Sequence, residues 1–292
     1  MKALLRYWKE NRYDTETGLY VWYDQMESGA DDLPISEVPS KHTDGWNEKD
    51  HGLSISSTDV MVFLIREFEA FYRFCSAWID YPQLSEQDKL TLENDKKDAK
   101  QSANKAKRAL IETLWDEQEG VFIAYNTKTK KHVNNRVFLM ALPLLLISDE
   151  SEDECSVFLR DKVAKIMSPL NGILAEDMLT EFGIRSTSLS DHRYSNANII
   201  DPYSNWCGPV WVIANVLLIY GISNTGNWPL SLQIARCLVT TLGIDLGVTG
   251  SWHECYHAET GKGLAAEGFL SWNTLAATLL ENLRSKRNCL KL

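Results

Sequence analysis

The residue types that could do chemistry are concentrated in two short stretches near opposite ends of this 292-residue chain. Stretch 250–263 sets two histidines and two carboxylates, one of them Glu254, between glycines. Stretch 22–32 likewise crowds carboxylates and aromatic residues around Gly29. Two acidic turns that meet on folding are what a two-carboxyl catalyst needs, because one group donates a proton while the other attacks or activates water.

The first stretch also offers a different chemistry. The run from His253 to His257, with Glu254 between them, matches the H-E-x-x-H pattern of zinc peptidases. That pattern binds zinc on a helix, where residues i and i+4 share a face. Gly250 and the glycines that follow the motif would break such a helix. The local sequence therefore argues against a zinc site, although Glu281 stays open as a third ligand.

A cleft lined by both stretches would suit a sugar. Aromatic faces cover the apolar C–H faces of a pyranose ring, and carboxylates or amides bind its hydroxyl groups. The residues expected around this cleft are the carboxylates Glu27, Asp31, Asp32 and Glu254 and the aromatic residues Trp22, Trp206, Trp211 and Trp252. Their types predict hydrolysis of a glycosidic bond by a carboxyl pair.

The composition limits the other functions. A net charge of −10 gives no long-range attraction to nucleic acid or to an anionic membrane, and the basic stretch 96–108 reads as a solvated helix face. The six cysteines show no C-x-x-C pair, so reduced thiols are expected. We expect no signal peptide in the charged N-terminus and no apolar run of membrane-spanning length. We expect a cytoplasmic protein that binds neither nucleic acid nor membrane, with self-association left open.

The elements that must position these residues are helices linked by glycine turns. Gly18, Gly120 and Gly250 each precede or follow acidic and aromatic residues. The polar loop 171–202 is long enough to be a functional loop. Helices are expected at 1–11, at 60–75 before Pro82, after a cap at Ser85, at 136–147 with Pro143 inside, after a cap at 151–154, from 206–211 with Pro209 in the first turn, at 231–242 and at 271–287. This order predicts an all-α toroid of helical hairpins, with residues 1–292 as one domain.

Three motifs carry a resemblance to a known family. Residues 27–32 are similar to an E-S-G-x-D-N motif, residues 205–211 to W-x-G-P-x-W, and residues 252–261 to H-E-x-Y-x-x-x-T-G. In this order the chain resembles the catalytic domain of glycoside hydrolase family 63 and its trehalase-like relatives, including the mannosylglycerate and glucosylglycerate hydrolases. The resemblance spans residues 7–283.

The resemblance implies an (α/α)6 toroid and an inverting, exo-acting α-glycosidase without a cofactor. Asp31 would be the general acid and Glu254 the general base, acting on an α-glucoside or α-mannoside such as an oligosaccharide or a glycosylglycerate. The residues that it implies for substrate binding are Trp22, Gln25, Glu27, Arg185, Tyr194, Trp206, Trp211, Trp252, His253 and Tyr256.

The sequence departs from the family pattern at three points. Asp32 stands where the family usually has Asn, which would place a second carboxyl beside the acid. Cys207 replaces a residue that is often basic, which argues against an anionic aglycone. The helices counted are fewer than six hairpins require, so the first hairpins are expected to be missing before Met1. An inactive toroid that still binds carbohydrate is therefore the alternative to an active glycosidase.

Overall fold

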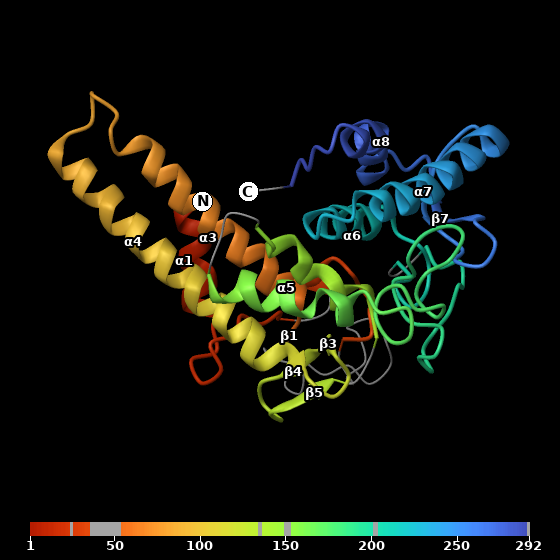
Figure 1. Ribbon diagram of the computed structural model, residues 1–292, viewed down its shortest axis with the longest axis horizontal. Coiled ribbons are helices and arrows are strands. Elements are labelled where there is room, and N and C mark those ends of the chain that lie inside the picture. Colours follow the sequence, from red (N-terminus) through yellow and green to blue (C-terminus); the bar gives the residue numbers. More distant parts are fainter. Residues whose placement is uncertain (24–25, 36–53, 134–135, 149–152, 201–203, 291–292) are drawn as a thin grey trace.

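Helices joined in antiparallel pairs make up most of the fold (Figure 1). The computed structural model describes residues 1–23, 26–35, 54–133, 136–148, 153–200 and 204–290. One half contains α1 (Lys2–Asn11), α3 (Thr58–Trp78), α4 (Glu86–Ala109) and α5 (Glu154–Ile166), and the other contains α6 (Val212–Asn224), α7 (Trp228–Thr249) and α8 (Ala276–Arg284). The buried hydrophobic residues of both halves form one continuous cluster.

The long hairpin of α3 and α4 projects to one side of the molecule (Figure 1). Most of the predicted apolar stripe of α3 is buried, although Phe63 is exposed, and the helix ends ahead of Pro82 as expected. The hydroxyl of Ser85 caps α4 by accepting the N–H of Asp88 (3.1 Å). α4 is highly charged, and the residues it buries are small, including Ala99, Ala103 and Ala106. These alanines recur at helical spacing and let the two backbones approach closely.

The apolar segment η3 (Phe138–Leu146) joins the two halves. Every residue of this segment is buried, and it packs against both α3 and α6. The sequence predicted a helix interrupted by Pro143, and the structure instead forms a 3-10 helix with Pro143 inside it. Proline lacks the N–H that an α-helix needs and clashes with the preceding turn, which explains the change of helix type.

The other half is built on α6, which is buried on most sides, and on α7. α7 extends beyond the predicted range 231–242 at both ends and stops at Gly250, whose φ is 79°. By length and composition alone α7 could span a membrane, contrary to expectation, with 33% of its most apolar window buried. It packs against α6 and α8, and core helices of water-soluble proteins pass the same test. The C-terminal segment forms η4 (Trp272–Leu275) and then α8, within the predicted range 271–287.

The strands are short and antiparallel. β1 (Ile55–Ser56), β4 (Ala124–Asn126) and β5 (Lys131–Val133) form one sheet, β2 (Trp115–Asp116) pairs with β3 (Val121–Phe122), and β6 (His253–Tyr256) pairs with β7 (Gly263–Glu267). A π-helical turn, η2 (Leu110–Leu114), leads from α4 into β2. The turns predicted at Gly18, Gly120 and Gly250 are confirmed, since all three glycines have positive φ.

The segment before α6 corrects the prediction of a helix over 206–211. Val210 is extended and exchanges two backbone hydrogen bonds with Tyr256, with N–O distances of 2.8 and 3.0 Å. A residue paired in this way cannot belong to a helix, so α6 begins at Val212 and Pro209 lies before it. This pairing brings residues 205–211 beside β6.

Candidate active site

The first acidic turn is held in place by polar contacts from distant parts of the chain. η1 (Met26–Ser28) leads through Gly29 to Asp31. Oδ2 of Asp31 accepts the backbone N–H of Ser204 (3.1 Å) and its hydroxyl (2.9 Å). Glu27 accepts the N–H of Tyr23 (2.6 Å) and pairs with Arg12 (3.1 Å). Glu27 therefore joins the two ends of the turn and attaches the turn to the segment that follows α1.

Asp32 lies beside Asp31 and is tied to the same distant segment. Its Oδ1 accepts the backbone N–H of Trp206 (2.5 Å), and its backbone oxygen lies 3.2 Å from Sγ of Cys207. Burial raises the pKa of Asp32 to about 6, although the N–H of Trp206 and the thiol of Cys207 favour the ionised form. The negative charge of Asp31 adds to the increase. The turn thus holds two adjacent carboxyl groups that repel each other.

Glu254 lies on β6, opposite an irregularity in β7. Burial raises the pKa of Glu254, whereas the backbone N–H of Ala266 favours the ionised carboxylate and lowers the pKa. The negative charge of Asp31 raises it again. The fold therefore brings Asp31 and Glu254 close enough for their charges to interact, although they come from opposite ends of the sequence.

A buried carboxylate on α7 supports the strand that carries Glu254. Asp245 is 6% exposed. Its carboxylate accepts the backbone N–H of His253 (3.1 Å), lies 3.0 Å from Nδ1 of that ring and accepts the hydroxyl of Tyr256 (3.0 Å). The backbone oxygen of His253 accepts the side-chain amide of Asn273 (2.8 Å). The residues on either side of Glu254 are thereby fixed.

A second network of hydrogen bonds and an ion pair holds the loop that follows β6. Arg185 is 6% exposed, and its guanidinium contacts Glu259 (3.1 Å), the hydroxyl of Tyr194 (3.2 Å) and the backbone oxygen of Glu176 (2.9 Å). Tyr194 in turn donates to Glu259, which also accepts the amide of Asn196. The sequence predicted Arg185 and Tyr194 as substrate ligands, and the structure commits both to this network.

The comparisons with known proteins identify the family. The sequence model of the mannosylglycerate hydrolase MGH1-like glycoside hydrolase domain matches residues 1–272. This chain belongs to that family of glycoside hydrolases. No match was found among the curated protein sequences.

Solved structures agree in fold. The family 63 mannosylglycerate hydrolase from Thermus thermophilus in complex with glucose has a TM-score of 0.67 and 18% identity, covering 95% of this chain and 66% of that one. The same enzyme with Tris gives 0.65 and 16%, with 96% and 69% covered. Neutral trehalase from Saccharomyces cerevisiae gives 0.58 and 13%, with 96% and 56% covered. The predicted relation to (α/α)6 toroids is therefore confirmed, and this glycoside hydrolase spans about two thirds of the mannosylglycerate hydrolase chain.

Two of the aromatic residues predicted to contact substrate lie in the core of this hydrolase. Trp211 and Tyr256 are each 0% exposed, so neither offers a surface to a sugar. The indole N–H of Trp211 donates to the backbone oxygen of Asn205 (2.9 Å). Trp206 is 4% exposed and stacks on Trp211, with centroids 3.9 Å apart, and on Phe138. The rings of Phe138, Trp206 and Trp211 thus stack together in the core, next to the backbone N–H that Trp206 donates to Asp32.

Trp206 nevertheless keeps one polar atom free. Its buried indole Nε1 has no hydrogen-bond partner within the part of the chain that the structure describes. A buried donor without a partner costs free energy, so such groups usually serve a ligand or a water molecule. We therefore predict that Trp206 contacts the substrate through this N–H and not through the face of its ring.

Trp22 and Trp252, two further predicted ligands, are held by hydrogen bonds to other parts of the chain. The indole N–H of Trp22 lies 3.1 Å from Oδ1 of Asp59, and that of Trp252 donates to the backbone oxygen of Leu242 (3.2 Å). Both rings are partly buried and pack against the core. Gln25 lies outside the described residues. Their predicted contacts with substrate stay predictions.

The geometry excludes the zinc-peptidase hypothesis. Residues 253–256 form a strand, in which an extended chain would separate His253 from His257 by about 13 Å. The ring of His253 faces Asp245, and Nδ1 of His257 accepts the N–H of Glu259 (3.2 Å). Over the described ranges, no three His, Cys, Asp or Glu side chains are grouped so that they could hold a metal ion.

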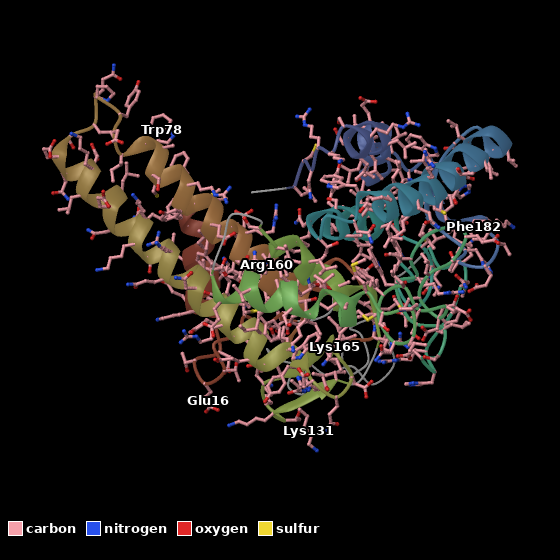
Figure 2. The ribbon with its side chains drawn as sticks, in the orientation of Figure 1. Glu16, Trp78, Lys131, Arg160, Lys165 and Phe182 are labelled. Atoms are coloured by element: carbon pink, nitrogen blue, oxygen red, sulfur yellow. The ribbon has the colours of Figure 1, made fainter. Side chains whose placement is uncertain are left out.

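Four residues of the site were missed by the sequence analysis: Ser204, Asp245, Asn198 and Glu259. Asp245 was detectable as the one acidic residue of a mostly apolar helix, eight positions before His253. Asn198 belongs to the polar loop 171–202 that the sequence marked as functional. The start of this loop packs tightly on the β6–β7 turn, because a Cβ at Gly261 would lie 2.5 Å from the ring of Phe182 (Figure 2).

Proposed function

We propose that this glycoside hydrolase is an inverting, exo-acting α-glycosidase in which Asp31 is the general acid and Glu254 the general base. The observation that carries the proposal is that one short segment ties these two residues together, since Ser204 donates to Asp31 and Val210 pairs with Tyr256 on the strand of Glu254. Residues 223 positions apart acquire such a relation only when the fold brings them to one site. Family membership supports the reaction class.

The hydrogen bonds of Asp31 suit a proton donor whose orientation is fixed. Backbone N–H groups can only donate, so Oδ2, which receives the N–H of Ser204, must act as an acceptor. A proton on Asp31 would then reside on Oδ1, the oxygen left for the leaving group of the substrate. In glycoside hydrolysis this proton passes to the glycosidic oxygen as the bond to the anomeric carbon breaks.

The surroundings of Glu254 suit a base. Its carboxylate accepts one N–H from Ala266, which stabilises the ionised form and leaves other lone pairs for a water molecule. The base removes a proton from that water as the water attacks the anomeric carbon from the face opposite the leaving group. Configuration at the anomeric carbon is then inverted.

An α-glucoside or α-mannoside is the proposed substrate. The neighbouring structures support it, because one is a mannosylglycerate hydrolase in complex with glucose and another is a trehalase. A further structure of the former contains D-glycerate. Cys207 gives this chain no positive charge at its position, so neutral aglycones should be tested beside glycerate.

The decisive experiment follows the released sugar by proton NMR within minutes of mixing. The purified chain is incubated separately with trehalose, α-mannosyl glycerate, α-glucosyl glycerate and short α-glucans. First release of the β-anomer, lost in Glu254→Gln and in Asp31→Asn, is the expected result. First release of the α-anomer would overturn inversion, because retention requires a nucleophile.

The same experiment tests the inactive alternative. If no sugar is released but the chain binds one of these glycosides by calorimetry, it is a carbohydrate-binding toroid and the catalytic assignment fails. Glu254→Gln is then expected to bind as the unaltered chain does, because no proton transfer is at stake.

A further inference from the structure

The β6–β7 pairing is irregular where it faces the general base. His253 pairs with Glu267 and Cys255 with Leu264, so Glu254 alone stands opposite both Ala265 and Ala266. This two-against-one arrangement is a β-bulge, which bends a strand and redirects nearby groups. The bulge sets Ala266 opposite Glu254, and the backbone N–H of Ala266 favours the ionised form of that carboxyl and lowers its pKa.

The bulge depends on an unfavourable backbone conformation. Ala265 has φ of 61°, in the left-handed region that glycine normally occupies in such bulges. A side chain with Cβ is disfavoured there, so the conformation persists only when other contacts hold it. Ala265 is 7% exposed, and its surroundings therefore fix it on several sides.

Asn198 supplies a direct contact to this residue. Its Oδ1 accepts the backbone N–H of Ala265 at 2.6 Å, across 67 positions of the chain. Because that N–H can only donate, the oxygen assignment of the amide is fixed. The same loop makes a comparable contact elsewhere, since Oδ1 of Asn196 accepts the N–H of Ala258 (3.0 Å).

We propose that Asn198 is a positioning residue for the general base, which acts by holding Ala265 in the bulge that directs the N–H of Ala266 at Glu254. The inference rests on the proposed function, because it takes Glu254 as the base. Without Asn198, Ala265 would relax toward an extended conformation and Ala266 would turn away from the carboxylate. Glu254 would then lose both a hydrogen bond and its orientation.

The test uses Asn198→Ala, Ala265→Gly and the double variant. The Glu254 carboxyl is titrated by carbon-13 NMR of protein labelled at glutamate, with Glu254→Gln to assign the signal. In Asn198→Ala the titration midpoint is expected to rise, because the N–H that favours the ionised form is lost. In the double variant the midpoint is expected to return, since glycine adopts positive φ without help.

Kinetics supply a second measurement. Asn198→Ala is expected to lower kcat by about ten- to a hundredfold with KM unchanged, because misplacing a catalytic group affects the transition state. Adding Ala265→Gly is expected to recover most of that loss. If Asn198 only stabilised its own loop, a glycine at position 265 in β7 would not restore the lost activity.

Failure of this inference can be told apart from failure of the proposed function. Asn196→Ala loosens the same loop and is expected to leave the titration of Glu254 unchanged. An unshifted midpoint in Asn198→Ala, or no recovery in the double variant, would overturn the positioning role. If the unaltered chain hydrolyses no glycoside, the proposed function fails while the titrations still decide whether Asn198 holds the bulge.

Discussion

The backbone N–H of Trp206 donates to Oδ1 of Asp32 at 2.5 Å, across 174 positions of the chain. This bond joins the turn that carries the proposed acid to the stacked tryptophans in front of α6. It also makes Asp32 a structural carboxyl, although the residue lies beside Asp31. The turn therefore has one carboxyl for each task, Asp32 for attachment and Asp31 for the proposed proton donation.

Asp32→Asn is expected to change how stability depends on pH. The pKa of Asp32 rises from 3.8 to about 6 on folding, so the folded protein disfavours the ionised carboxyl. Stability is therefore highest when the group is protonated, falls as the pH rises from 3.8 through about 6, and stays lower above that range. The full effect is roughly 3 kcal/mol, and the amide removes it because an Asn oxygen can still accept the N–H of Trp206.

Urea unfolding at several pH values checks this prediction. The free energy of unfolding of Asp32→Asn, relative to that of the unaltered chain, should increase between about pH 4 and pH 7. If the difference in unfolding free energy between the two proteins is the same at every pH, the charge of Asp32 does not destabilise the folded protein. Asp14→Asn is a useful comparison, because that residue lies in another turn.

Asp245→Asn is expected to destabilise the fold and to slow catalysis. The carboxylate accepts from the N–H and ring of His253 and from Tyr256, and an amide would oppose one of these donors with its own N–H groups. The cost in unfolding free energy is expected to be about 3 kcal/mol, because a buried charge-assisted network is broken. Thermal unfolding and kcat measured on the same samples check it.

Tyr256→Phe is the matched control for this network. It removes a single donor to Asp245 and keeps the buried ring, so a loss of about 1 kcal/mol is expected. An equal loss in both variants would show that the carboxylate contributes only through the tyrosine. In that case Asp245 would not fix the strand around Glu254.

The sequence predicted the helical fold, but it could not predict which partner each aromatic or charged side chain would find. Trp206 and Trp211 belong to a motif. Nothing in their residue type distinguishes a ring that contacts a sugar from a ring that stacks on another ring in the core. From the sequence, Arg185 was predicted to bind substrate. In the structure its guanidinium contacts Glu259, which lies 74 positions later. Such pairings depend on long-range packing, whereas the helix cap at Ser85 and the glycine turns depend on neighbours and were predicted.

The six cysteines are expected to differ sharply in reactivity. Burial and the charge of Asp32 raise the pKa of Cys207, so its thiol is almost entirely protonated at neutral pH. Cys289 is exposed. Under limiting iodoacetamide, mass spectrometry should find Cys289 alkylated first and Cys207 unmodified. Early modification of Cys207 would mean that the acid turn opens in solution.

Asp31→Asn is expected to lower the pKa of Glu254. Burial raises this pKa above the usual 4.5, and the negative charge of Asp31 adds to the increase. Removing that charge makes ionisation of Glu254 easier, so its carbon-13 titration midpoint should move down toward 4.5. Asp32→Asn is the control, because the pKa of Asp32 is about 6 and its carboxyl is therefore mostly uncharged near pH 4.5. An unchanged midpoint in Asp31→Asn would separate the two carboxyl groups in space and remove the main support for a shared catalytic site.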